Sequence, residues 1–337
     1  MNPAQLLTYF ERISKAPDAI LRLRRFILDL AVRGKLVEQQ PNDEPAVELV
    51  KRIQTEKKRL IKEGKIRNQE PWELNGETEA PFKVPSTWEW VPATFPAYPV
   101  SDMGKKVQMK DVLESGEFPV VDQGKVFVRG HCNDRSKVIR VESPLVLFGD
   151  HTRETKLIDF DFIVGADGVK LLHPICLLTD YYYLALRWLP LDSRGYGRHY
   201  KLLKAALIPL PPLAEQHRIV AKVDELRALC DRLETMQAKR ESRRDSLVGA
   251  SLNRLNNGND SESFREYARF HLNNFPRLTT RPAHVQQLRQ AILNLAIRGQ
   301  LVPQDQNDEP ASELLKRIKA EKARLIKEGT LRKEKPL

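Results

Sequence analysis

The feature that most constrains this chain is an internal duplication. Residues 23–67 and 288–332 align without a gap at an offset of 265, and two thirds of the 45 aligned positions are identical. A match of that length does not arise by chance, and a repeat restricts the architectures that a chain can adopt. Two copies are too few for a solenoid. Lying on either side of one unrelated region, they predict two equivalent helical docking elements.

Each copy has the pattern of two helices joined by a turn. In the first copy, the apolar residues of 27–31 recur at helical spacing and Gly34 supplies a stop. The stretch 42–45, Asn-Asp-Glu-Pro, then begins a second helix that runs to Gly64 with its apolar residues on one side. We expect that side to dock partners, although it could serve only the fold of a helical bundle. The residues expected there are Ile53, Leu60, Leu314, Ile318 and Leu325.

The sequence changes character between residues 71 and 212. This region is rich in aromatic and β-branched residues, glycine and proline. Its short apolar runs at 119–121, 145–148 and 162–164 are bounded by turn residues, which is typical of buried strands. We predict a mostly β, mixed domain at 71–212. The whole chain should therefore have an α+β fold, with helical regions at 1–70 and 281–337.

A long helix is predicted over residues 213–256. Its apolar residues follow alternating steps of four and three, which is the seam of a coiled coil. The residues of this seam are Ile219, Val223, Leu226, Cys230 and Leu233. A helix of some 40 residues would be about 60 Å long, which suits a spacer better than a core helix. A polar stretch then breaks the pattern, and we predict a linker at 257–280.

The charge of the chain is unevenly distributed. The net charge is +11 at pH 7 and the pI is near 9.5, which favours an acidic partner such as nucleic acid. The net charge is +5 over residues 1–70, −1 over 71–210 and +7 over 211–337. The central domain has no net positive field, so a DNA-reading surface on it must gather its cations on one face.

Composition also limits the location and the chemistry. Three widely separated cysteines without a Cys-x-x-Cys pair suit a reducing compartment and argue against a zinc site. No apolar stretch approaches the roughly 20 residues of a membrane span, and the first ten residues do not have the pattern of a secretion signal. Glycine motifs for nucleotides, methyltransferase motifs and metal-binding histidine spacings are absent. We predict a cytoplasmic, non-catalytic protein that binds neither a membrane nor a cofactor of its own.

Two polar clusters in the central domain combine cations with aromatic or polar residues and glycine. In the stretch 193–201, arginine can bind a phosphate or a guanine edge, tyrosine can stack, and glycine allows close approach of the backbone. The stretch 149–156 directly follows a predicted strand, where polar side chains often contact ligands. Either stretch could instead be a solvated turn. The residues predicted to contact DNA are His151, Arg153, Lys156, Arg194, Tyr196, Arg198, His199, Tyr200 and Lys201.

The second cluster also supports an alternative hypothesis. Glu154 and Lys156 form the Glu-x-Lys triplet found in many metal-dependent nuclease sites, and Asp134 offers a second carboxylate. Two carboxylates would hold Mg²⁺ and the lysine would orient the attacking water. Such a triplet arises readily in a chain of which 30% of the residues are charged. A stand-alone Mg²⁺-dependent nuclease is therefore the secondary hypothesis.

Several segments resemble the specificity subunits of type I restriction-modification systems. Residues 208–220, which read IPLPPLAEQHRIV, resemble the passage from a target-recognition domain of that family into its spacer helix. Other segments resemble one class of those recognition domains and its usual beginning. They are 81–90, 148–153, 165–170 and 194–201. The resemblance covers nearly the whole chain and adds Lys170 to the residues expected to contact DNA.

The resemblance implies a function. In that family each recognition domain reads one half of a split double-stranded DNA target, and helices hold two such domains apart and dock methylation subunits. Those partners use S-adenosylmethionine, and restriction or translocase subunits that use ATP and Mg²⁺ complete the complex. The resemblance thus implies a DNA-binding subunit whose helical regions form a spacer and a platform for methylation subunits.

The chain departs from the family in having one recognition domain instead of two. It is either a natural or engineered half-subunit or a fragment of a longer product. As a half-subunit, two copies would pair about a two-fold axis and require an inverted-repeat target. The stretch 92–96 also differs from the usual beginning of the domain, which leaves the first strand undefined. A third possibility, a decoy that competes for methylation subunits, predicts assembly with them but no target preference.

Overall fold

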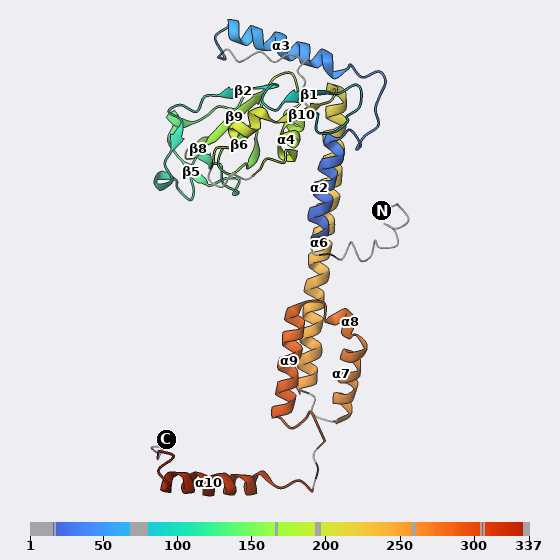
Figure 1. The fold of residues 1–337 in the computed structure, drawn as a ribbon, viewed down its shortest axis with the longest axis vertical. Coiled ribbons are helices and arrows are strands. Elements are labelled where there is room, and N and C mark those ends of the chain that lie inside the picture. Colours follow the sequence, from blue (N-terminus) through green and yellow to red (C-terminus); the bar gives the residue numbers. More distant parts are fainter. Residues whose placement is uncertain are drawn as a thin grey trace. The chain divides into compact units, whose positions relative to one another are not determined.

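The computed structural model describes residues 16, 18–67, 80–165, 168–192, 197–257, 261–303, 305 and 307–332 (Figure 1). The chain divides into two compact units, Met1–Glu234 and Thr235–Leu337. The described helices are α2 (Ala19–Val32), α3 (Ala46–Lys62), α4 (Thr179–Trp188), α5 (Tyr200–Ala205), α6 (Leu213–Asn257), α7 (Ser261–Asn273), α8 (Phe275–Leu278), α9 (Pro282–Ile297) and α10 (Ala311–Lys327). The described strands all lie in the first unit, and the α+β class predicted from the sequence is confirmed.

Three small sheets form the central domain, which we define as residues 80–212. The strands are β1 (Glu89–Pro92), β2 (Ala97–Val100), β3 (Lys106–Val107), β4 (Phe118–Val121), β5 (Gly130–Cys132), β6 (Leu145–Gly149), β7 (Thr155–Ile158), β8 (Ile163–Gly165), β9 (Val169–Pro174) and β10 (Leu207–Leu210), with short 3-10 helices at Met109–Asp111 and Arg135–Lys137. The strand orders are β2-β9-β6-β7, β3-β8-β4-β5 and β1-β10. The antiparallel pair β1 and β10 joins the beginning of the domain to its end. The first strand, which the sequence left undefined, is β1.

The core of the central domain is continuous with helix α3. Leu49 and Ile53 of α3 are buried in the same apolar cluster as Trp88 and Tyr182. The buried Tyr182 hydroxyl donates a hydrogen bond to the carbonyl oxygen of Ala93 at 2.8 Å, so its polar group is satisfied. The second helix of the first repeat is therefore an integral part of the domain that follows it.

Lys57 shows how closely α3 approaches the domain. Its Nζ lies 5.0 Å from the centre of the Phe95 ring, a distance at which an ammonium is attracted to the face of an aromatic ring. Burial disfavours the charged ammonium and lowers the pKa of Lys57 to about 8. Docking of α3 thus removes water from a charged group as well as from apolar ones.

A buried hydrogen-bond network fixes the start of the long helix α6. The carboxylate of Glu215 accepts hydrogen bonds from Trp88 Nε1 at 2.8 Å and from Gln39 Nε2 at 2.5 Å. Burial raises the pKa of Glu215 above its ordinary value. One turn later, Arg218 forms an ion pair with Asp43. These contacts join the turn of the first repeat, the central domain and the spacer helix.

Helix α6 is 45 residues long and its first part packs against α2 (Figure 1). At 1.5 Å per residue it extends about 68 Å, close to the helix length predicted from the sequence. Ile27 and Ala31 of α2 are buried with three residues of the predicted α6 seam, Ile219, Val223 and Cys230. Arg24 of α2 adds hydrogen bonds to Asp231 at 2.5 Å and to Glu234 at 3.1 Å.

The second unit consists of helices in the residues that the structure describes. Val248 and Leu252 of α6 share a small apolar core with Leu278 and Ala291. Residues 257–280, predicted as a linker, instead contain α7 and α8. The spacing of Phe264, Tyr267 and Ala268 gives α7 an apolar side that packs on this core, and this pattern overrides the polar break before it.

The second helices of the two repeats differ in burial although their sequences nearly coincide. Ile53 of α3 is 0% exposed, whereas its counterpart Ile318 of α10 is 50% exposed. Every residue of α10 is exposed or half-buried. The same apolar side is therefore covered in the first unit and uncovered in the second, within the described residues.

No helix among the described ranges has both the length and the apolar character needed to cross a bilayer.

Candidate nucleic-acid interface

Three segments of the central domain meet at the buried side chain of Asp150. The Asp150 amide donates a hydrogen bond to the carbonyl oxygen of Gly168, and the His199 amide donates to the carbonyl oxygen of Asp150, both at 2.7 Å. The Tyr200 amide donates to Asp150 Oδ1, also at 2.7 Å. The turn after β6, the start of β9 and the start of α5 are thus held together. Residues 197–201, the described part of the later polar cluster, therefore lie beside the cluster at 149–156.

The turn between β6 and β7 has an unusual backbone. Arg153 has a φ of 65°, a left-handed conformation that is uncommon for residues other than glycine and that often occurs at functional sites. A Cβ atom on Gly149 would lie 2.2 Å from Thr152 Oγ1, so the turn requires glycine there. The Arg153 guanidinium donates to the carbonyl oxygen of Leu191 at 2.5 Å. The turn therefore holds an exposed arginine in a fixed position.

Two lysine ammonium groups lie near the ring of Tyr200. Lys170 Nζ is 5.5 Å and Lys204 Nζ is 5.4 Å from the centre of its ring. The electron-rich face of the ring attracts each ammonium group. Burial raises the pKa of the Tyr200 hydroxyl above its ordinary value. The sequence prediction omitted Lys204, although its position one helical turn after Tyr200 is the signal that could have identified it.

These groups form a cationic surface, which we call the basic face. Its members come from the turn after β6, from β9, from α5 and from the residues just before α5, and all are exposed except the half-buried Lys170. They are Arg153, Lys170, Arg198, Lys201 and Lys204. Within the described part of the chain, Arg198 and Lys201 form no salt bridge, so their charges are available to an anionic ligand. Lys170 and Lys204 both approach the ring of Tyr200, so strand β9 and helix α5 bring two of these cations together.

Two residues predicted to contact DNA lie in the interior instead. Lys156 is 4% exposed, because the alternation of strand β7 places it on the same buried side as Ile158. Its ammonium donates to the carbonyl oxygens of Asp122 at 2.8 Å, Val126 at 2.6 Å and Phe127 at 3.3 Å. Burial lowers the pKa of Lys156. It stabilises a loop and does not contribute to the surface.

His199 is the second buried residue of the predicted set. Its Nδ1 donates to the carbonyl oxygen of Asp150 at 2.9 Å, which fixes the ring inside the junction of the three segments. His151 is half-buried, and its amide donates to Gln123 Oε1 at 3.0 Å. A Cβ atom on Gly168 would lie 2.6 Å from the His151 ring, so these two residues pack directly on each other. Arg194 and Tyr196 lie outside the described residues.

The position of Lys156 also bears on the nuclease hypothesis. Its three hydrogen bonds to carbonyl oxygens leave the ammonium unable to orient a water beside Glu154. Asp134, the proposed second carboxylate, instead accepts hydrogen bonds from the backbone amide and hydroxyl of Ser136. Among the residues that the structure describes, no group of three or more His, Cys, Asp or Glu side chains is arranged to hold a metal ion.

The ten residues predicted to lie on the docking helices fall into a buried group and a group that is exposed or half-buried. Those buried within the first unit are Ile53, Leu60, Ile219, Val223 and Cys230. Those half-buried or exposed are Leu226, Leu233, Leu314, Ile318 and Leu325. The first group therefore stabilises the fold, and only the second group has surface to offer to a partner.

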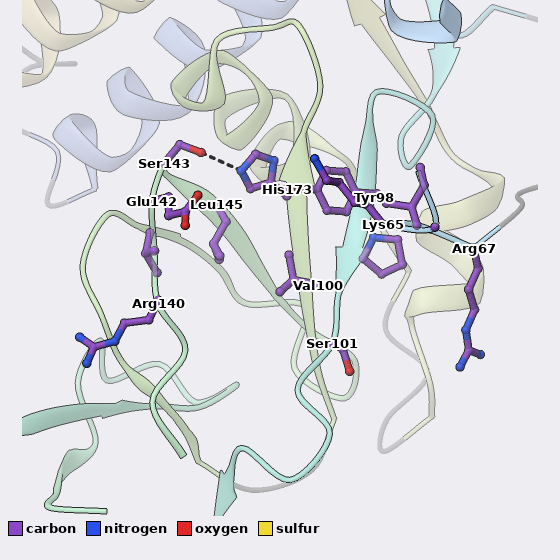
Figure 2. A pocket seen from close by; sticks show the side chains of 14 residues that line it. Lys65, Arg67, Tyr98, Val100, Ser101, Arg140, Glu142, Ser143, Leu145 and His173 are labelled. Atoms are coloured by element: carbon purple, nitrogen blue, oxygen red, sulfur yellow. Dashed lines mark hydrogen bonds between the residues drawn. The ribbon is translucent and has the colours of Figure 1, made fainter. Parts of the chain in front are cut away.

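A cavity of 740 Å³ lies away from the basic face, between the end of α3 and strands β2 and β9 (Figure 2). Tyr98 of β2 and its strand partner His173 of β9 stack in its wall, with ring centres 4.9 Å apart (Figure 2). His173 Nδ1 lies 3.0 Å from the carbonyl oxygen of Pro174, which can only accept, so Nε2 accepts from the Ser143 hydroxyl at 2.7 Å. Burial lowers the pKa of His173, which favours the neutral ring. His173 and Ser143 thus satisfy each other's polar atoms, and none of the described residues predicted to contact DNA lines this cavity.

The chain is similar to specificity subunits of type I restriction enzymes. Over 94% of its length it is 37% identical to the EcoAI specificity subunit and 35% identical to the EcoEI specificity subunit, both from Escherichia coli. It spans 58% of the length of each relative. Among solved structures, it matches the HsdS subunit from Thermoanaerobacter tengcongensis at 20% identity and a TM-score of 0.36, over 65% of this chain and 52% of that one. No protein-family model matches the chain.

Proposed function

Because the chain belongs to the type I restriction enzyme specificity subunits, we propose that it gives such an enzyme its DNA sequence preference and that its central domain reads one half of a bipartite target. The observation that carries this proposal is the basic face. Three segments far apart in the sequence converge on Asp150 and bring exposed cations near one another, in a region whose net charge over residues 71–210 is only −1. Such concentration of charge is what a DNA-reading surface requires.

The chemistry of the basic face suggests which of its members bind base edges and which bind phosphates. Arg198 is exposed and has a planar guanidinium, which can bind a guanine edge or a phosphate through two hydrogen bonds. The lysines are suited to phosphates, whose contacts set the position of the domain on the duplex without specifying sequence. Arg153, held by the carbonyl oxygen of Leu191, offers a second guanidinium in a fixed position.

The helical regions are proposed to dock the catalytic partners. We propose that methylation subunits, which use S-adenosylmethionine, bind the exposed apolar side of α10 and the exposed seam residue Leu233, and that restriction or translocase subunits using ATP and Mg²⁺ join them. The uncovered Leu314 and Ile318 support this docking, since apolar side chains gain from burial against a partner. The chain itself would be non-catalytic, hold no cofactor, and act on DNA in the cytoplasm.

Pairing of two copies is the remaining part of the proposal. The chain has one reading domain and two copies of the docking repeat, so two chains related by a two-fold axis would present two identical readers. Identical readers related in this way recognise an inverted repeat. A pair would have a mass of about 78 kDa, twice the 38.8 kDa of one chain.

Selection from a randomised double-stranded DNA library tests this proposed function. The purified chain should recover a short defined sequence, and a paired chain should recover it as an inverted repeat with a spacer of fixed length and free sequence. Recovery of a single half-site would contradict pairing but leave reading intact. Recovery of no sequence would contradict the proposal and favour the decoy alternative, and Mg²⁺-dependent cleavage of the library would favour the nuclease.

A further inference from the structure

The hairpin loop between β4 and β5 presents apolar side chains at its tip. Val126 is 56% exposed and Phe127 is 46% exposed. Lys125 and Arg129 flank them and are also exposed. Single exposed apolar residues are common on protein surfaces and need no explanation. Two adjacent exposed apolar residues, flanked by cations on a loop of fixed conformation, do require an explanation.

The buried ammonium of Lys156 fixes the conformation of this loop. Its hydrogen bonds to the carbonyl oxygens of Asp122, Val126 and Phe127 join both ends of the 122–127 segment to strand β7. Burial of an ammonium is costly unless its donors are satisfied, and these three carbonyl oxygens satisfy the donors of Lys156. The loop is thus preorganised with its apolar tip turned outward.

The same loop adjoins the basic face. Gln123 Oε1 accepts a hydrogen bond from the His151 amide at 3.0 Å, and the Gln123 carbonyl oxygen accepts one from Thr152 Oγ1 at 2.5 Å. His151 and Thr152 belong to the turn that carries Arg153. DNA bound to the basic face therefore reaches the loop without a change in the fold.

The packing of Phe127 limits the kind of contact that it can make. Its ring lies against Phe160 in an edge-on arrangement, with ring centres 6.0 Å apart and an angle of 61° between the planes. One part of the ring is thus held by the protein and only the remainder is exposed. This geometry suits contact with the edges of bases rather than insertion of the whole ring between two base pairs.

We propose that Val126 and Phe127 contact the 5-methyl groups of thymines in the major groove, while Lys125 and Arg129 bind the flanking phosphates. The thymine methyl is the only apolar group that the base edges present there, and apolar side chains recognise it by burying it. The proposal rests on the function proposed above and specifies how part of the target is read.

Replacement of thymine by deoxyuracil in the DNA tests the proposal directly. The probe is the duplex recovered by library selection, synthesised with thymine or with deoxyuracil at every such position. The full chain should bind the deoxyuracil duplex roughly fourfold more weakly for each contacted methyl. The double variant Val126→Ser/Phe127→Ser should bind the thymine duplex on the order of tenfold more weakly, with the same salt dependence, and should no longer distinguish the two duplexes.

Ile297→Ser is the matched control, because Ile297 is 85% exposed on α9 in the second unit. It should retain the full discrimination between thymine and deoxyuracil. Equal binding of both duplexes by the unchanged chain would overturn the inference, as would discrimination that survives in the double variant. Failure to select any sequence overturns the proposed function as well, so the two failures are distinguishable.

Discussion

Replacing Ile53 with alanine should lower the free energy of unfolding of the first unit by about 2–5 kcal/mol, whereas the same replacement at Ile318 should change it by less than about 0.5 kcal/mol. The two isoleucines occupy equivalent positions of the duplicated sequence. Ile53 is buried in the core of the central domain, so its truncation leaves a cavity. Ile318 is half exposed, so its truncation removes few contacts within the chain.

Urea unfolding followed both by tryptophan fluorescence and by far-ultraviolet circular dichroism measures this difference, because the helical signal also reports on the second unit. The four tryptophans of the chain all lie in the first unit, so their emission reports on that unit even if the two units unfold separately. The Ile318 variant should instead lose affinity for methylation subunits. Equal destabilisation by the two replacements would mean that α10 is as well covered as α3, and would contradict the proposed docking surface.

Removing three cations from α5 and the residues before it should lower DNA affinity on the order of a hundredfold. The variant is Arg198→Ala/Lys201→Ala/Lys204→Ala, and these side chains are all exposed on the basic face. Loss of an arginine that contacts a base should relax one position of the target, and loss of each phosphate-binding lysine should reduce the salt slope of binding by about one. Fluorescence anisotropy at several salt concentrations, with the selected duplex as the probe, provides both quantities.

The matched control removes the same charge from elsewhere in the chain. Arg265→Ala/Arg269→Ala/Arg277→Ala changes three exposed arginines of the second unit and lowers the net charge equally. Its affinity for the selected duplex should fall far less, and its sequence preference should be unchanged. If the control and the basic-face variant weaken binding by the same factor, binding depends on net charge alone and the assignment of the basic face is wrong.

The sequence predicted the helices of the repeats, the seam of α6 and the β character of the central domain, because each depends on local periodicity. Differences in burial between the repeats could not be predicted in this way. Ile53 and Ile318 stand in nearly identical local sequences, and their burial depends on a domain that is distant in the chain. Likewise, the seam predicted which side of α6 is apolar but not that Leu233 would remain exposed.

Long-range contacts also decided the roles of two polar residues. Lys156 has the local sequence of a surface cation, and its burial depends on carbonyl oxygens some thirty residues earlier in the chain. Glu215 lies in the segment that resembles the family's passage into the spacer helix. Its hydrogen bonds to Trp88 and Gln39 provide a physical reason for a glutamate at that position, since it joins three parts of the first unit.

Methyl transfer in a reconstituted system is the most direct test of the proposal that this chain gives a methylating enzyme its sequence preference. The chain, purified methylation subunits of a type I enzyme and labelled S-adenosylmethionine would be combined with duplexes that carry or lack the selected sequence. Label should enter DNA only when the chain is present and only in duplexes that carry that sequence. Equal labelling of both duplexes, or labelling that does not require the chain, would contradict the account.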